Sequence, residues 1–132
     1  MRSPKRRLLC VEDQETCEVL DFLLSYSDYE YVLRTATTAA EGLQLAQNEQ
    51  FDLCLLDLRL PDGSGLELCR QIRSLHPHTP ILFYSTIAYE AYRQEALDAG
   101  AQEYLVKPQS MSALIEVIAR LSGQAKSAST GM

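Results

Sequence analysis

The sequence has no apolar run long enough to cross a membrane, no Cys-x-x-Cys pair, and few basic residues beyond its first seven positions. A membrane-spanning helix needs about 20 predominantly apolar residues, so a transmembrane protein is excluded. Zinc sites and dithiol redox motifs use closely spaced cysteines. The four cysteines of this chain are instead scattered, at Cys10, Cys17, Cys54 and Cys69. We therefore expect reduced cysteines that pack in the core of a cytoplasmic protein.

Basic charge is concentrated at the amino terminus. Four of the 12 Lys and Arg residues lie in the first seven positions, and 18 Asp and Glu residues bring the net charge to −6. Because the rest of the chain is acidic and lacks a basic stripe, we expect no direct binding to nucleic acid. The basic start is followed by only four apolar residues, 8–11, which is too short for a signal peptide. We expect a solvated leader at residues 1–6.

The length of 132 residues suits one domain, and 46% hydrophobic with 23% charged residues is ordinary for a globular protein. The polar end of the chain, residues 122–132, predicts a flexible tail or the start of a linker. We therefore place the ordered domain at residues 7–121.

Five short apolar runs alternate with segments of helical pattern. The runs are residues 8–11, 31–36, 53–56, 81–84 and 104–106. Continuous apolar runs suit parallel strands that are covered on both faces. The first helical segment carries an apolar stripe from Val19 to Leu24, and the second begins with a capping box, Thr38 to Glu41. Three more helical segments span residues 66–75, 89–99 and 112–121. Gly100 is expected to end the second of these three.

The alternation predicts an α/β fold with a doubly wound, five-stranded parallel sheet. Ligands bind such sheets at the carboxyl ends of the strands. Polar residues stand at the ends of four of the predicted strands. Glu12 and Asp13 follow the first strand and Asp57 follows the third. Ser85 and Thr86 follow the fourth, and Lys107, with Pro108 after it, follows the fifth. If the first and third strands are neighbours, three carboxylates converge on one small pocket.

Three close carboxylates repel one another, and a hard divalent cation such as Mg²⁺ relieves that repulsion. Asp57 is then the candidate nucleophile for capture of a phosphoryl group, with Lys107 and Ser85 neutralising and binding its oxygens. Taken singly, each residue has a plainer interpretation. Asp13 would be a helix N-cap, Ser85 a turn residue and Lys107 a solvated surface lysine. Taken together, the matching chemistry of four strand ends favours the phosphoryl site.

With these motifs, residues 7–121 resemble a response-regulator receiver domain of two-component signalling. The resemblance rests on Glu12-Asp13, on Asp57 within the segment Leu55-Leu56-Asp57-Leu58-Arg59-Leu60-Pro61-Asp62-Gly63-Ser64-Gly65, on Ser85 after residues 80–84, and on Lys107-Pro108 after residues 99–104. It implies a flavodoxin-like (βα)5 fold with strand order 2-1-3-4-5.

The resemblance also implies the role of each residue. Asp57 would accept a phosphoryl group from a histidine kinase or a histidine phosphotransfer protein. Glu12, Asp13, Asp57 and the carbonyl of Arg59 would hold Mg²⁺, and Ser85, Thr86 and Lys107 would bind the phosphoryl group. Ser85 and Tyr104 would form the conformational switch, and the Lys107-Pro108 peptide would be cis.

The resemblance implies a signalling protein that is not a conventional enzyme. Its partners would be the phosphoryl donor and either a downstream effector protein or an output domain outside this sequence. We expect no contact with a membrane, and a monomer or a phosphorylation-dependent dimer.

Four positions depart from the family pattern or tune it. Thr86 stands where Ala or Gly is usual, and Gln109 stands where a large apolar residue is common. Arg59 and Ile87 occupy the two positions that tune dephosphorylation in the family, and their size predicts a slow attack by water.

Three alternatives differ in function. A flavodoxin-like FMN carrier would need a phosphate loop after the first strand, where Glu12 and Asp13 would repel phosphate. A phosphatase with an aspartate nucleophile would want an acid at the position of Arg59. A degenerate receiver would act as a phosphorylation-independent adaptor through protein–protein contacts, which the complete set of site residues disfavours.

Overall fold

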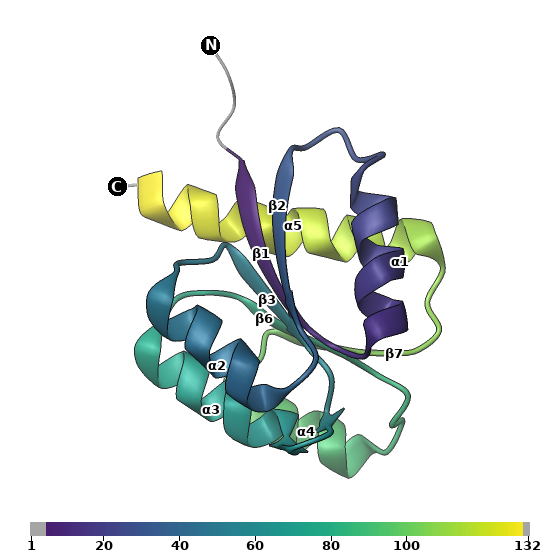
Figure 1. Ribbon diagram of the computed structural model, residues 1–132, viewed down its shortest axis with the longest axis vertical. Coiled ribbons are helices and arrows are strands. Elements are labelled where there is room, and N and C mark those ends of the chain that lie inside the picture. Colours follow the sequence, from purple (N-terminus) through teal and green to yellow (C-terminus); the bar gives the residue numbers. More distant parts are fainter. Residues whose placement is uncertain (1–4, 131–132) are drawn as a thin grey trace.

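The computed structural model describes residues 5–130, apart from the side chains of residue 111 and residues 125–130. Five parallel strands form one sheet in the order β2-β1-β3-β6-β7, and helices cover both of its faces (Figure 1). The short strands β4 and β5 form a separate hairpin. The predicted doubly wound fold is therefore confirmed, since the five main strands follow the predicted order 2-1-3-4-5.

The main sheet consists of β1 (Arg6–Val11), β2 (Tyr31–Ala36), β3 (Leu53–Leu56), β6 (Ile81–Ser85) and β7 (Glu103–Val106). The hairpin, which the sequence did not predict, pairs β4 (Arg59–Leu60) with β5 (Gly63–Ser64). The helices are α1 (Gln14–Leu24), α2 (Ala39–Asn48), α3 (Gly65–Leu75), α4 (Glu90–Asp98) and α5 (Met111–Thr130).

The sheet separates two hydrophobic clusters. Helices α2, α3 and α4 lie on one face, and α1 and α5 lie on the other (Figure 1). Side chains alternate along a strand, so Leu9 and Val11 of β1 pack on the first face while Leu8 and Cys10 pack on the second. Each fully buried leucine contributes about 1.5–3 kcal/mol. The central strands β1, β3 and β6 are held so firmly that the positions of their carboxyl ends are well defined.

The predicted apolar stripe on α1 is wrong for two residues. Val19 is 45% exposed and Phe22 is 59% exposed. The residues that α1 buries are Cys17, Leu20 and Leu24. Their spacing of three and four places them on one side of the helix, and that side alone faces the sheet.

Two predicted helix ends are confirmed. The hydroxyl of Thr38 accepts a hydrogen bond from the backbone N–H of Glu41, so Thr38 is the N-cap of α2. The Glu41 carboxylate accepts from the Thr38 hydroxyl, whereas in a full capping box it accepts from the backbone N–H. Gly100 has φ of +113°, a left-handed conformation that favours glycine after a helix. Asp62 of the hairpin adds a second cap to α2, since its carboxylate accepts from the N–H groups of Ala39 and Ala40.

Helix α5 is longer than predicted, because it continues through residue 130 instead of ending at residue 121. The predicted flexible tail thus begins inside a helix, and residues 131–132 lie outside the described residues. No proline interrupts residues 122–130, and an interior glycine such as Gly123 costs only about 1 kcal/mol. None of the described helices, α5 included, is long and apolar enough to span a membrane.

The predicted leader is wrong at Arg6, while residues 1–4 lie outside the described residues. Arg6 is the first residue of β1, and its guanidinium donates to the carbonyl of Ala119 at 2.8 Å and to the hydroxyl of Ser122 at 3.1 Å. Its Cζ also lies 3.7 Å from the ring centre of Tyr29. These partners pull the start of the chain onto α5, so Arg6 is part of the folded domain.

Arg73, near the end of α3, holds the loops below the sheet together. Its guanidinium donates to the carbonyls of His76, Pro77, Thr79 and Gly100 and to the side-chain oxygen of Gln102. A planar fork of N–H donors suits this set of acceptors, and a lysine ammonium does not.

We expect Arg73→Lys to lower the free energy of unfolding by about 1–3 kcal/mol, because carbonyls lose their donors. Urea unfolding followed by circular dichroism measures the effect. Arg70→Lys is the matched control, since Arg70 lies on the same helix and its ion pair with Glu67 is exposed. Equal midpoints for the two variants would contradict the proposed role of Arg73.

Candidate functional site

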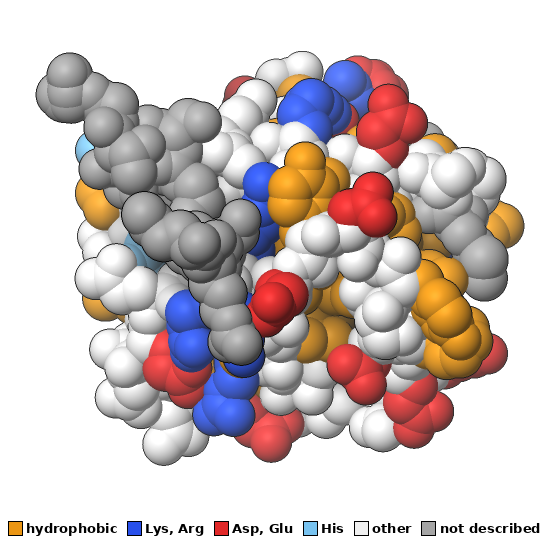
Figure 2. All heavy atoms as spheres, turned by 90° about the horizontal axis from the view of Figure 1, so that it is seen from above, with side chains coloured by type: hydrophobic (Ala, Val, Ile, Leu, Met, Phe, Trp, Pro, Cys, Tyr) orange, Lys and Arg blue, Asp and Glu red, His pale blue; other side chains and the backbone are white. Residues whose placement is uncertain are grey.

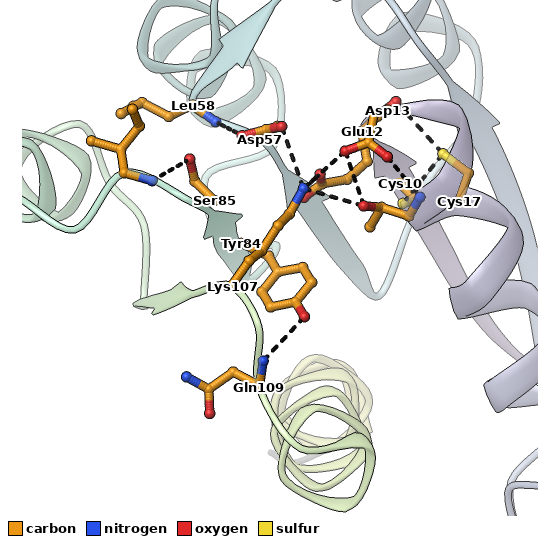
Figure 3. A network of polar contacts seen from close by, with 12 residues as sticks. Cys10, Glu12, Asp13, Cys17, Asp57, Leu58, Tyr84, Ser85, Lys107 and Gln109 are labelled. Atoms are coloured by element: carbon orange, nitrogen blue, oxygen red, sulfur yellow. Dashed lines mark hydrogen bonds and ion pairs between the residues drawn. The ribbon is translucent and has the colours of Figure 1, made fainter.

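The polar residues that follow the strands meet at one edge of the sheet. Glu12 and Asp13 come after β1, Asp57 after β3 and Lys107 after β7, while Ser85 ends β6. In Figure 3 the Lys107 side chain extends toward the three carboxylates, and Ser85 lies on the other side of Asp57. The strand order puts β1 beside β3, so the predicted convergence of carboxylates occurs.

The three carboxylates form a compact acidic cluster. Oxygen atoms of Glu12, Asp13 and Asp57 all lie within 4.8 Å of one another. The side chain of Glu12 is fully buried, that of Asp57 is 16% exposed and that of Asp13 is 52% exposed. The cluster thus runs from the interior of the domain to its surface.

The ammonium group of Lys107 forms ion pairs with all three carboxylates. Its Nζ lies 2.8 Å from Glu12 Oε1, 3.0 Å from Asp13 Oδ2 and 3.5 Å from Asp57 Oδ2. Burial alone would lower the pKa of Lys107, but the hydrogen bond and charge of Glu12, aided by Asp13 and Asp57, raise it. Lys107 is therefore charged at every physiological pH. The Lys107-Pro108 peptide is cis, in agreement with the resemblance.

One positive charge does not balance three carboxylates. Burial, and after it the charge of Asp57, raises the pKa of Glu12 to about 9. For Asp13, burial acts in the same direction, but hydrogen bonds from Thr16 and Lys107 outweigh it and lower the pKa. Ionised Glu12 would therefore gain most from a further cation.

The residues present fit a hard divalent cation. The second oxygen of Glu12, Oε2, is buried and has no hydrogen-bond partner among the described residues. Such an orphaned acceptor costs about 1–3 kcal/mol or more. Carboxylate oxygens are the ligands that Mg²⁺ prefers, with the remaining positions taken by water. The donor set of Glu12, Asp13 and Asp57 therefore suits Mg²⁺.

Asp13 is both the N-cap of a helix and a member of the acidic cluster. It is the N-cap of α1, because its Oδ1 accepts from the backbone N–H of Thr16 at 2.7 Å. Its Oδ2 accepts from the hydroxyl of Thr16 at 3.0 Å and from Lys107. The cap thus fixes the orientation of a carboxylate that also belongs to the acidic cluster.

The sequence-based interpretation missed Thr16. Its hydroxyl lies 3.2 Å from Lys107 Nζ, so it joins the first turn of α1 to the lysine. The spacing Asp13-x-x-Thr16 resembles a capping motif, and that signal could have placed Thr16 beside the site.

The predicted switch residues lie next to each other. Ser85 is 1% exposed, and its hydroxyl accepts from the N–H of Ile87 at 3.3 Å. Tyr104 is turned inward, where its ring stacks on Phe83 and its hydroxyl donates to the carbonyl of Ile87 at 2.6 Å. Thr86, the residue after Ser85, is exposed. Burial raises the pKa of Tyr104, which keeps its hydroxyl a donor.

The loop after Asp57 folds back on itself, so that its end lies against the Asp57–Leu58 backbone. Asp57 Oδ1 accepts from the N–H of Leu58 at 2.7 Å, and the N–H of Gly65 donates to the carbonyl of Leu58 at 2.7 Å. The Arg59 side chain is exposed, and its backbone is part of β4.

A search of protein families gives a match over residues 8–119 with the response regulator receiver domain. The chain belongs to this family. The match spans every residue of the acidic cluster together with Lys107, Ser85 and Tyr104, so the resemblance seen in the sequence is confirmed.

Curated relatives of this receiver domain are longer proteins. The response regulator protein PilR of Pseudomonas aeruginosa is 36% identical over 116 residues, which are 87% of this chain and 26% of PilR. The transcriptional regulatory protein CusR of Escherichia coli is 35% identical over 116 residues, 87% of this chain and 49% of CusR. The chain therefore spans between a quarter and a half of these relatives.

Solved structures share the whole fold. A CheY-like receiver domain protein from Methanospirillum hungatei has a TM-score of 0.82 and 31% identity, covering 94% of this chain and 98% of that one. The receiver domain of the sensor histidine kinase PA1611 from Pseudomonas aeruginosa, solved with a magnesium ion in its active-site cleft, has a TM-score of 0.79 and 26% identity. That alignment covers 91% of this chain and 99% of the other.

Gly65 provides a test of how the receiver domain holds its central aspartate. A Cβ atom at this position would lie 2.0 Å from the carbonyl oxygen of Asp57, whereas one at Gly63 would meet nothing within 4 Å. We expect Gly65→Ala to lower the free energy of unfolding by about 1–3 kcal/mol, because the backbone of Asp57 must shift. Thermal and urea unfolding measure the loss. Gly63→Ala is the control, and equal stability of both variants would contradict the prediction.

Proposed function

We propose that this domain is a phosphoacceptor switch, in which Asp57 receives a phosphoryl group from a histidine kinase or a histidine phosphotransfer protein. The observation that carries the proposal is the meeting of three carboxylates and Lys107 at the carboxyl edge of the sheet. Membership of the response regulator receiver family supports it. The relatives' own partners and outputs belong to longer proteins, of which this chain matches only a part.

In the proposed reaction an oxygen of Asp57 attacks phosphorus, and the bond from phosphorus to the donor atom breaks, so that an acyl phosphate forms on Asp57. Glu12, Asp13, Asp57 and the carbonyl of Arg59 would hold Mg²⁺. Bound Mg²⁺ supplies positive charge that offsets the carboxylates and the phosphoryl oxygens. Asp57 is only partly buried, so a donor can reach it.

Lys107 and Ser85 bind the transferred group in this proposal. Lys107 already lies 3.5 Å from Asp57 Oδ2, and its flexible chain lets the ammonium follow a new anion. The Ser85 hydroxyl accepts from Ile87 and also contacts the Tyr104 hydroxyl, and its rotation would turn its own proton toward a phosphoryl oxygen. Thr86 follows Ser85 in the chain and is exposed, and it would border the bound phosphoryl group.

Ser85 and Tyr104 would couple binding of the phosphoryl group to a conformational change at the surface. Both residues bind the backbone of Ile87, one through its N–H and the other through its carbonyl. A pull on Ser85 therefore changes the segment that holds the Tyr104 hydroxyl. The switch selects between existing arrangements of this segment and of α4.

The wider role follows from this chemistry. We infer a cytoplasmic regulator that accepts a phosphoryl group instead of turning over a substrate, and that acts through a downstream effector or an output domain, as a monomer or a phosphorylation-dependent dimer. On the face seen in Figure 2, Lys and Arg side chains lie beside Asp and Glu side chains instead of forming a basic stripe. This distribution supports the proposal that the domain itself does not bind nucleic acid.

Incubation with Mg²⁺ and acetyl phosphate, followed by intact mass measurement, tests the proposal. We expect a gain of one phosphoryl group in the wild type and none in Asp57→Asn, because the amide is not a nucleophile. Asp98→Asn, which changes an exposed aspartate on α4, is the control and should be phosphorylated normally. No adduct with any small donor, together with no response to beryllofluoride, would favour the phosphorylation-independent adaptor instead.

The lifetime of the phosphorylated form tests the roles of Arg59 and Ile87. Both side chains are large and lie two residues beyond Asp57 and Ser85, so we expect Arg59→Ala and Ile87→Ala each to shorten the lifetime about threefold or more, or roughly 0.65 kcal/mol of barrier. Decay of the adduct in intact mass spectra gives the rate. Arg93→Ala, an exposed change on α4, should leave the lifetime unaltered. Lifetimes that stay near the wild-type value would show that neither side chain hinders water.

A further inference from the structure

Two of the four cysteines face each other beside the acidic cluster. Cys10 lies in β1 and Cys17 in the first turns of α1, and their sulfur atoms are 3.8 Å apart. Both thiols are free and buried. Figure 3 shows the pair next to Glu12 and Asp13, on the side away from Asp57. The phosphoryl chemistry proposed above uses neither sulfur.

We propose that Cys10 and Cys17 form a reversible disulfide under peroxide, and that this bond weakens cation binding by Glu12 and Asp13. The first part stands on the geometry of the two sulfur atoms alone. The second part rests on the proposed function of the acidic cluster as a magnesium site.

Small oxidants have a route to one sulfur of the pair. Cys17 is 5% exposed, whereas Cys10 is 0% exposed. Cys17 lines a surface hollow of about 210 Å³ between α1 and β2, together with Gln14, Glu18, Asp21, Leu33 and Thr35. Hydrogen peroxide, which is little larger than water, fits this hollow and meets Cys17 first.

The proposed step balances with one molecule of hydrogen peroxide. The sulfur of Cys17 attacks one peroxide oxygen, the O–O bond breaks, and the other oxygen leaves as water with the thiol proton. Cys17 is then a sulfenic acid, oxidised by two electrons. The sulfur of Cys10 then attacks the sulfur of Cys17 and the S–S bond forms. The hydroxyl group of the Cys17 sulfenic acid leaves as a second water with the thiol proton of Cys10.

The other two cysteines lack this arrangement. Cys69 donates its thiol hydrogen to the carbonyl of Ala99 at 3.6 Å, and Cys54 is fully buried in β3. Both belong to the hydrophobic cluster on the opposite face of the sheet from Cys10 and Cys17. They therefore serve as internal controls for specificity.

The pair is joined to the acidic cluster by short connections. The thiol of Cys17 donates to the carbonyl of Glu12 at 3.7 Å, and its backbone N–H donates to the carbonyl of Asp13 at 3.0 Å. Cys10 lies two residues before Glu12, at the same strand end. A disulfide removes the thiol hydrogen and requires the two sulfur atoms to approach to roughly 2.05 Å. The backbone of Glu12 and Asp13 lies between the two cysteines in the chain and must adjust.

Peptide mapping without reductant and magnesium titration calorimetry test the two parts separately, on the wild-type chain before and after hydrogen peroxide. We expect one linked peptide pair joining Cys10 to Cys17, and Mg²⁺ affinity about tenfold weaker in the oxidised protein, since changes around ligating residues commonly have effects of 10- to 100-fold. Dithiothreitol should restore both the free thiols and the affinity. This cycle on one chain needs no substitution.

Variants define the specificity. Cys54→Ala should behave as the wild type, while Cys17→Ser should keep its Mg²⁺ affinity after peroxide. A missing Cys10–Cys17 link, or a link through Cys54 or Cys69, overturns the disulfide. A link that leaves Mg²⁺ affinity unchanged overturns its control of the site. If the reduced wild type binds no Mg²⁺, the proposed function fails while the mapped link still decides the disulfide.

Discussion

Glu12, Asp13 and Asp57 hold oxygen atoms within 4.8 Å of one another, and like charges so close repel strongly unless positive charge stands between them. The rest of the domain is arranged to impose this proximity. Buried strands β1 and β3 are neighbours in the sheet, so their carboxyl ends cannot separate. Lys107 relieves part of the repulsion, and Glu12 Oε2, which has no hydrogen-bond partner within the part of the chain that the structure describes, shows where relief is incomplete. The pairing of β1 with β3 therefore both stabilises the sheet and creates the need for a further cation at its edge.

Several small contacts keep this crowded edge in order. Asp13 is oriented by its role as the cap of α1, and Lys107 is oriented by Thr16 as well as by the carboxylates. On the other side, Gly65 allows α3 to begin against the backbone of Asp57. Each element that begins or ends here contributes a hydrogen bond or a close approach. The site is thus a property of the helix and strand ends, which the cores on both faces of the sheet hold in register.

Much of this arrangement is readable from the sequence, because it depends on local patterns. The apolar runs predicted the strands, and the strand ends predicted the acidic cluster, Lys107 and Ser85. The features that were missed depend on contacts between distant segments. Arg6 joins β1 because Ala119 and Ser122 accept its hydrogen bonds. The β4–β5 hairpin is too short for a periodic signal. The pairing of Cys10 with Cys17 requires knowing which side of α1 faces β1, and hydrophobicity alone misjudged that side at Val19 and Phe22.

The clamp made by Arg6 has a mechanical consequence. The Arg6 guanidinium joins one end of β1 to the middle turns of α5, and the other end of β1 leads directly into Glu12 and Asp13. The six residues of β1 span about 20 Å; all of them pair with β2, and residues 8–11 also pair with β3, which makes β1 stiff. A displacement of α5 would therefore move β1 along its own axis as a rigid unit, because the paired strand does not bend easily. Arg6 thus connects the middle of α5 to the acidic edge.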